Sequence, residues 1–148
     1  MFLTLEQNYY VTYMGKKCNI DMTDWNDGVY ESYLLGQDEK YIFYVSIERK
    51  HTKVGALSKL HIEEITYCVQ DRERVSKLSE LQNMNRSFWV NRLSNIYLEE
   101  KHFFSGLFGK ETEMLGVFIS DVGEDYVKLV TGQEIDAEKI TKIETVVK

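Results

Sequence analysis

The segment Glu39–Val45, with the sequence EKYIFYV, has a second version eighty-five positions later in Glu124–Val130, EDYVKLV. The tyrosine, the β-branched residue after it and the final valine coincide in the two segments. An isoleucine pair spaced by three then closes each version, Ile62–Ile65 (IEEI) in the first and Ile140–Ile143 (ITKI) in the second. The sequence therefore predicts two diverged versions of one small unit, which describes an architecture and not an activity.

Composition limits the class of protein. A chain of 148 residues with 43% hydrophobic residues fits one ordinary domain or two very small ones, and it is long enough to bury a core. It has no proline and only 9 glycines, which argues against a flexible linker or a low-complexity tail. There is no basic N-terminal segment before an apolar stretch, and no apolar run near the roughly 18 residues of a membrane span. We therefore expect no signal peptide, no membrane span and a cytoplasmic location.

Charge and cysteine usage narrow the partners. The formal net charge is −6, with a mildly basic middle (residues 71–110) and a clearly acidic end (residues 111–148). None of the three segments (residues 1–70, 71–110 and 111–148) supplies the basic stripe that binds nucleic-acid phosphates. Cys18 and Cys68 are too few and too distant for a disulfide framework, and we expect reduced, packed thiols. The bias towards Tyr, Phe, Met, Ile, Asn and Lys resembles A+T-rich coding, as in a low-G+C bacterium or its phages and mobile elements.

Runs of aromatic and β-branched residues broken by Gly and Asp predict antiparallel strands joined by hairpins. The expected strands are Cys18–Thr23, Val29–Leu35, Tyr41–Ile47, Gly55–His61, Thr112–Ser120, Tyr126–Thr131 and Glu134–Asp136. In Tyr41–Ile47 both faces are apolar, so the strand must be covered on both sides. Either the helical segment or the second version covers the additional face, or that face binds a partner or another copy of the chain.

Between the two versions, Asp71–Met84 predicts an amphipathic helix, because an apolar residue recurs at every third position. We expect this helix to continue to Leu98, and the alternative is a pair of strands at Phe88–Val90 and Tyr97–Phe104. The predicted fold class is mainly β (α+β), two small antiparallel barrels or sheets bridged by a helix. The predicted division is residues 1–69, a helical bridge at 70–98, and residues 99–148.

The short strands, the glycine-marked bend and the isoleucine pair before a last strand resemble the Sm-like small-barrel folds. The resemblance covers both versions of the unit and leaves out the helical segment. Sm-like proteins that bind RNA assemble into rings and contact the RNA through Asp, Asn, Arg or Lys in their loops. Asp38 and Gly123 occupy the same aligned position and differ. The resemblance thus implies the fold, while the RNA-binding motifs are not found.

A protein-binding site is the first functional hypothesis. Aromatic side chains on a glycine-containing loop make good anchors in a partner's pocket, and one segment has three phenylalanines and a leucine interleaved with glycine: Phe103, Phe104, Leu107 and Phe108. Acidic residues near the turns of the second version would steer a basic or nucleic-acid-handling protein, and those we name are Asp121, Glu124 and Asp125. Alternatively, the phenylalanines and the leucine pack against the core, and the acidic residues are simply solvated at the surface. A narrower version of the hypothesis is a phage or mobile-element inhibitor of a host enzyme.

Other classes have less support in the sequence. An RNA-binding protein would use the basic residues Lys16, Lys17, Arg49, Lys50 and Lys53. Tyr9, Tyr10, Tyr13 and Trp25 could stack on bases, although ordinary packing is the preferred interpretation. The three histidines are too scattered for a metal site, and no cofactor motif is present. No nucleophile, phosphate loop or carboxylate pair with local support occurs, so we do not expect an enzyme. The third alternative is an enzyme whose site these motifs do not reveal.

Overall fold

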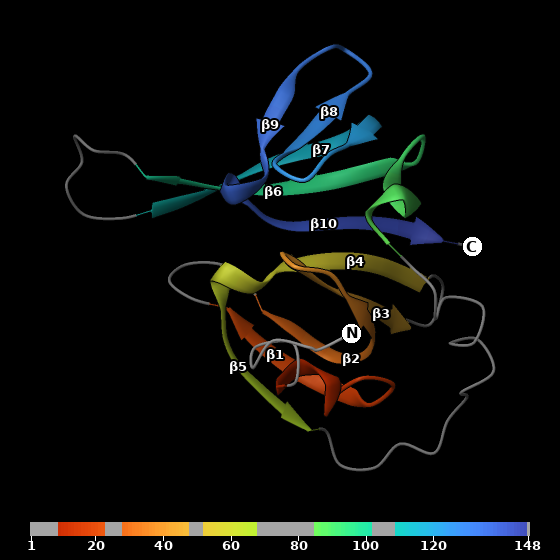
Figure 1. Ribbon diagram of the computed structural model, residues 1–148, viewed down its shortest axis with the longest axis vertical. Coiled ribbons are helices and arrows are strands. Elements are labelled where there is room, and N and C mark those ends of the chain that lie inside the picture. The colour runs from red at the N-terminus through yellow and green to blue at the C-terminus, as the bar shows by residue number, and fades with distance from the viewer. Residues whose placement is uncertain (1–8, 23–27, 48–51, 68–84, 102–108, 148) are drawn as a thin grey trace.

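A computed structural model describes residues 9–22, 28–47, 52–67, 85–101 and 109–147 (Figure 1). They form one ten-stranded antiparallel sheet in the order β5-β1-β2-β3-β4-β10-β6-β7-β8-β9. The first half of the chain supplies β1 Lys17–Met22, β2 Val29–Gln37, β3 Tyr41–Ile47, β4 Thr52–Ser58 and β5 Ile62–Tyr67. The second half supplies β6 Leu93–Lys101, β7 Gly109–Val122, β8 Tyr126–Leu129, β9 Glu134–Asp136 and β10 Ile140–Val147. The predicted mainly β class is confirmed.

Within each half, the last strand lies beside the first. The first half has the order β5-β1-β2-β3-β4 and the second half has β10-β6-β7-β8-β9. The two halves meet where β4 pairs with β10, from Leu57 opposite Lys142 to Thr52 opposite Val147. In Figure 1 these two strands run side by side across the middle of the molecule, with one half on each side. The sheet is therefore continuous through the joint between the halves.

The same hairpin turn occurs in both halves. The backbone N–H of Asp38 donates to the carbonyl of Tyr41 at 2.9 Å, and the N–H of Gly123 donates to the carbonyl of Tyr126 at the same distance. In the first half the Asp38 side chain also accepts from the Tyr41 N–H at 2.8 Å, as an aspartate at the start of a turn does. Glycine lacks this side chain, and at 123 it leaves room that the Tyr126 ring occupies.

A matched bulge lies in the second strand of each half. Glu31 in β2 and Gly116 in β7 both have a positive φ, of 51° and 67°. The N–H of Glu31 donates to Oδ1 of Asn19 at 2.8 Å, and the N–H of Gly116 donates to Oδ1 of Asn95 at 2.9 Å. An asparagine on the first strand of each half thus holds a left-handed residue on the second.

Isolated bridges and short helices repeat the pattern. Met14 forms a parallel bridge with Leu34, and Val90 forms one with Ile119. A three-residue 3₁₀ helix follows the fourth strand of each half, Lys59–His61 and Ala137–Lys139. These features lie at the same places in the strand order, so the two halves have the same local geometry although few residues are identical.

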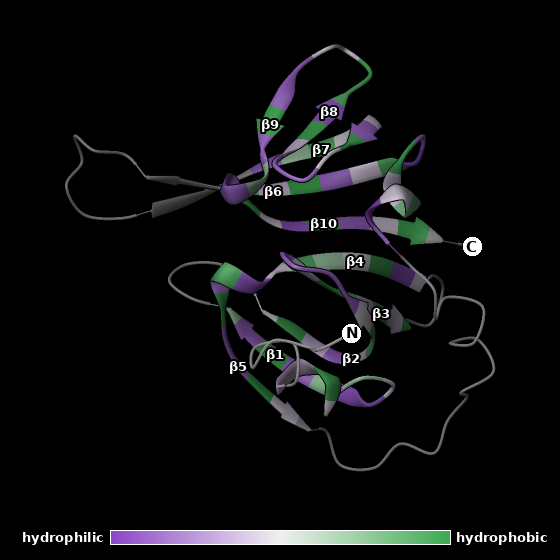
Figure 2. Ribbon diagram, viewed as in Figure 1, coloured by the Kyte–Doolittle hydropathy of each residue, from purple (hydrophilic) through white to green (hydrophobic). Residues whose placement is uncertain are grey.

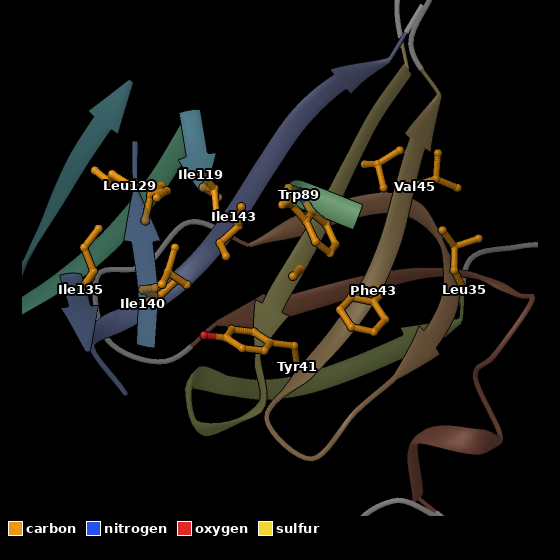
Figure 3. Close-up of a cluster of buried hydrophobic side chains, with 14 of the residues drawn as sticks. Leu35, Tyr41, Phe43, Val45, Trp89, Ile119, Leu129, Ile135, Ile140 and Ile143 are labelled. Carbon is orange, nitrogen blue, oxygen red and sulfur yellow. The ribbon is translucent and has the colours of Figure 1, made fainter. Parts of the chain in front are cut away.

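Two buried clusters form the core. One lies within the first half and includes Ile20, Ile42 and Tyr44, and the other joins both halves. The joint cluster, drawn in Figure 3, contains Tyr41, Phe43 and Val45 of β3 together with residues from all five strands of the second half. The alternation along β3 therefore divides its side chains between two cores. The expectation that the second half covers the additional face of this strand is confirmed.

Three expectations about single elements are wrong. The expected strand Gly55–His61 ends at Ser58, and Lys59–His61 is a 3₁₀ helix. The expected continuation of the helix and the alternative strand Phe88–Val90 are both replaced by the 3₁₀ segment Arg86–Trp89 and the strand β6, Leu93–Lys101. The helix therefore does not continue to Leu98, whereas the alternative strand from Tyr97 is correct as far as Lys101. Ile96 is buried in the joint core while Leu93 is exposed, an arrangement set by strand pairing and not by helical spacing. The expected helix Asp71–Met84 lies outside the described residues, and the three-part division of the chain stays a prediction.

Candidate binding face

Five large apolar side chains are exposed among the described residues of the second half. One of them, Leu115, is 61% exposed and precedes the left-handed Gly116 of β7. The other four form one set. They are Leu93 at 55% exposure, Phe118 at 46%, Val130 at 59% and Val146 at 51%, and we call them the apolar row. They come from β6, β7, the residue after β8 and β10. Figure 2 shows apolar segments, in green, on β6 and at the C-terminal end of β10, with polar segments between them. One face of these strands packs into the joint core, and the apolar row lies on the opposite, exposed face.

Strand register brings the row together. Leu93 lies directly opposite Phe118, and the N–H of Val130 donates to the carbonyl of Phe118 at 3.0 Å. In the antiparallel pairing of β10 with β6, Glu144 lies opposite Asn95. The same register continued by two residues puts Val146 opposite Leu93. Residues directly opposite on paired strands lie on the same face of a sheet. The four side chains therefore form one line across four neighbouring strands.

The equivalent face of the first half is closed. Tyr33 and Val45, which precede Phe118 and Val130 by eighty-five positions, are also opposite each other on paired strands. Their exposures are only 7% and 1%, because they belong to the core cluster that the second half completes. The same position in the fold is thus covered in one half and open in the other.

Carboxylates flank the open face. Asp121 of β7 and Glu134 of β9 lie opposite Lys128 on β8, and all three side chains are exposed. The Tyr126 hydroxyl donates to Oδ2 of Asp121 at 2.8 Å, and this hydrogen bond and the carboxylate charge raise the pKa of Tyr126. Asp136 lies opposite Tyr126 on β9. Beyond the apolar row the face is therefore mostly acidic.

Arg86 joins the hairpin turns of the two halves. Its Nε lies 2.5 Å from Oδ2 of Asp38, and its Nη1 donates to the carbonyls of Gly123 at 2.9 Å and Glu124 at 3.0 Å. Burial alone would lower the pKa of Arg86, but the hydrogen bond and charge of Asp38 outweigh it and raise the pKa. Sequence reasoning missed this residue, because an arginine before an expected helix carries no special pattern.

The predicted acidic residues are divided between these two places. Asp121 lies on the open face, whereas Glu124 and Asp125 lie in the turn that Arg86 contacts. The Asp125 carboxylate is 84% exposed and lies 2.6 Å from Nζ of Lys40 in the first half. Its hydrogen bond with Lys40 and the lysine charge lower the pKa of Asp125.

The predicted hydrophobic anchors Phe103, Phe104, Leu107 and Phe108 lie outside the described residues. The strands on either side of them are described, and Lys101 of β6 pairs with Gly109 of β7. Within the described chain, β6 and β7 have only each other as sheet neighbours from Glu99 to Lys101 and from Gly109 to Glu111. Figure 1 shows this two-stranded arm projecting from the sheet.

The candidate RNA-binding residues do not converge where they are described. Lys16 and Lys17 lie at the start of β1, whereas Lys53 lies on β4 with its Nζ 3.9 Å from Oε1 of Glu144. Two strands, β2 and β3, separate β1 from β4. Arg49 and Lys50 lie outside the described residues.

The tyrosines near the N-terminus pack against one another. Tyr10 is buried in the core of the first half, and Tyr9 is half exposed with its ring in edge contact with Tyr10 and Tyr13. Trp25 lies outside the described residues. Cys18 is buried in the same core, as predicted for a packed thiol, while Cys68 is not described.

Two further findings concern the described residues only. In that part of the chain, no three His, Cys, Asp or Glu side chains are arranged to hold a metal ion. No helix found there has the length and apolar character needed to span a membrane. His61 is buried with Nδ1 3.1 Å from Oγ of Ser58, and the other two histidines fall outside this part.

The fold and the open face together define a mainly β protein with two geometrically matched halves and an apolar row on the second half that no described residue covers. Comparisons with protein-family models, with curated proteins and with solved structures found no match to this chain.

Proposed function

We propose that this chain is a non-enzymatic protein-binding module, made of two diverged units that resemble the Sm-like fold. The binding face is the apolar row, and the partner is a protein with an apolar centre and a basic edge. One observation carries the proposal: Phe118 and Val130 are exposed where the equivalent Tyr33 and Val45 are covered by protein.

The proposal of two diverged units is supported by geometry that recurs at fixed spacings. The asparagine-held bulges lie at Asn19 and Asn95, and the turn hydrogen bonds lie at Asp38 and Gly123. The order of strands is the same in each half. Since short-range sequence similarity alone does not require shared strand order, the agreement favours a common ancestral unit.

Exposed apolar side chains in one line favour a protein partner. Single exposed hydrophobic residues are normal on a protein surface, whereas contiguous ones mark binding sites. Covering such area stabilises a complex by about 25 cal/mol for each Å² of apolar surface. The acidic flank formed by Asp121, Glu134 and Asp136 would attract a basic rim on the partner and speed its association.

The three phenylalanines and the leucine at Phe103, Phe104, Leu107 and Phe108 remain a second proposed contact, in the segment between the β6 and β7 strands of the projecting arm. The narrower proposal, a phage or mobile-element inhibitor of a nucleic-acid-handling enzyme, requires the same partner chemistry and rests on composition. RNA binding remains the alternative, although the described lysines proposed for it lie on separate strands.

The test compares two triple variants of the tagged chain in lysate of its host. Leu93→Thr, Phe118→Ser and Val130→Thr remove apolar side chains from the row. Val11→Thr, Tyr30→Ser and Leu60→Thr remove three exposed apolar side chains from the first half. We expect a stoichiometric, nuclease-resistant protein partner that binds the wild type and the control and is lost from the row variant.

Circular dichroism and Tm establish that both variants are folded. A partner retained by the folded row variant would contradict the proposed face. Capture of RNA in place of protein, or of partners released by nuclease, would contradict the protein-binding function and favour the Sm-like RNA alternative.

A further inference from the structure

The ten-stranded sheet has two open edges among the described residues. The end strands are β5, which pairs only with β1, and β9, which pairs only with β8. Each belongs to a different half. By their places in the strand order, β5 corresponds to β10 and β9 corresponds to β4. The two open edges are therefore equivalent to the two strands that already pair at the joint between the halves.

This equivalence gives a residue register for a joint between two copies of the chain. At the internal joint Leu57 lies opposite Lys142 and Ala56 lies opposite Ile143. A residue of β4 corresponds to the residue seventy-eight positions later in β9, and a residue of β10 corresponds to the residue seventy-eight positions earlier in β5. The same register between β9 and β5 of two copies therefore places Ile135 opposite Glu64 and Glu134 opposite Ile65.

The next pair in that register differs most from the internal joint. One residue beyond Leu57 and Lys142, the internal joint has the uncharged Ser58 and Thr141, both buried. The equivalent residues at the open edges are Asp136 and Glu63, and both are exposed.

The exposed residues of the open edges have the same sign of charge. β5 presents Glu63 and Glu64, and β9 presents Glu134 and Asp136. The internal joint instead contains Lys53 and Glu144, whose charges are opposite and whose side chains approach to 3.9 Å. Like charges directly opposite on paired strands are destabilising, and charged side chains on edge strands prevent edge-to-edge association.

We propose that β5 and β9 form a head-to-tail docking surface for a second copy of this chain, held apart by these four carboxylates. Strands equivalent to those of the joint lie at both edges, but pairing them in this register would place Glu63 directly opposite Asp136, with Glu134 diagonal to Glu63 on the same face. The chain is consequently one copy in solution at neutral pH. This inference rests on the equivalence of the two halves and does not require the protein partner proposed above.

The design of the test follows from the internal joint. Each carboxylate is replaced by the residue that the internal joint has at the equivalent position: Glu63→Thr, Glu64→Lys, Glu134→Ala and Asp136→Ser. Serine can also replace Asp136 as the N-cap, since the aspartate accepts from the Glu138 N–H at 3.0 Å. The control makes the same change of net charge at exposed positions off the edges, with Glu39→Thr, Glu113→Lys, Glu124→Ala and Glu138→Ser.

Mass is measured by light scattering after size exclusion, over a hundredfold range of concentration, with Tm to establish folding. We expect the wild type and the control to have the mass of one chain, and the edge variant to form concentration-dependent oligomers. Disulfide trapping with Glu63→Cys and Asp136→Cys, which take the place of Glu63→Thr and Asp136→Ser in the edge variant at two exposed positions that the register puts opposite each other, should link different copies.

Two results would overturn the inference. Oligomers of the wild type at pH 7 would mean that the carboxylates do not hold the edges apart. A folded edge variant that stays a single chain at every concentration would mean that the edges do not match. Loss of the protein partner in the lysate experiment leaves this measurement unaffected, so the two proposals fail separately.

Discussion

The hydroxyl of Tyr44 donates a hydrogen bond of 2.8 Å to Oε2 of Glu144, a residue one hundred positions later and in the other half. The tyrosine is on β3 and the glutamate on β10, with Gly55 of β4 opposite both. The ring passes over this glycine, since a Cβ at position 55 would overlap ring atoms of Tyr44. One fully buried side chain thus connects three strands across the joint.

Gly55→Ala should destabilise the protein by roughly 2–3 kcal/mol, because the Tyr44 ring must move and its hydrogen bond to Glu144 is strained or lost. Gly36→Ala is the control, since a Cβ there would meet only Phe43 at an ordinary 3.9 Å. Urea unfolding measures both free energies. Equal effects of the two substitutions would contradict the proposed role of Gly55.

Arg86 and Asp38 should be energetically coupled. Their side chains are 16% and 24% exposed, so a double-mutant cycle with Arg86→Ala and Asp38→Ala is expected to give about 1–3 kcal/mol. Lys40→Ala should leave Tm unchanged within error, because its partner Asp125 is largely in solvent. A coupling near zero would show that Arg86 does not hold the two turns together.

Stability should decline at alkaline pH because of two buried tyrosines. Burial raises the pKa of Tyr44 well above 10 and that of Tyr41 to about 12. The free energy that these two neutral tyrosines contribute to folding is therefore fully present below pH 10, the pKa of tyrosine in the unfolded chain. It is lost as the pH rises from there towards the raised pKa values of the folded protein. The expected slope is about −1.4 kcal/mol per pH unit for each group.

Urea unfolding between pH 9 and pH 11 measures this slope. Tyr41→Phe with Tyr44→Phe removes both titrating hydroxyls, and the variant should show a flatter dependence than the wild type. The comparison uses slopes and not absolute stability, because the variant also leaves Glu144 without the Tyr44 hydroxyl. Parallel curves would contradict the raised pKa values.

Trp89 is buried in the joint core beside Phe43, and its Nε1–H has no acceptor among the described groups. An unsatisfied buried donor costs about 1–3 kcal/mol, which offsets part of what the ring contributes. Trp89→Phe should therefore cost less than about 2 kcal/mol, whereas Trp89→Ala should cost about 3–5 kcal/mol. Similar losses for both would indicate that the indole N–H is satisfied.

The first three strands of the first half follow from the sequence, because alternation, aromatic residues and Gly or Asp turns agree there. Tyr41–Ile47 is the best case, since its two apolar faces predict two coverings and both are found. Sequence reasoning failed at β6. Leu93 and Ile96 have the spacing of a helix face, and strand pairing with β7 and β10 decides otherwise.

A local signal could have corrected that error. Asn19-Ile20 in β1 and Asn95-Ile96 in β6 are identical dipeptides, and each places a bulge-holding asparagine before a buried isoleucine. The apolar row could not be predicted, because Phe118 and Val130 have the hydrophobicity of core residues. Only the arrangement of the halves shows that nothing in the described chain covers them.

The most direct test of the binding face places a photo-reactive phenylalanine analogue at Phe118 in the living host. Lys139, which is exposed on the 3₁₀ helix after β9, is the control position. The account predicts that Phe118, and not Lys139, crosslinks to one other protein, and that the product withstands nuclease. Crosslinks from Phe118 to nucleic acid, to a second copy of this chain or to nothing would contradict it.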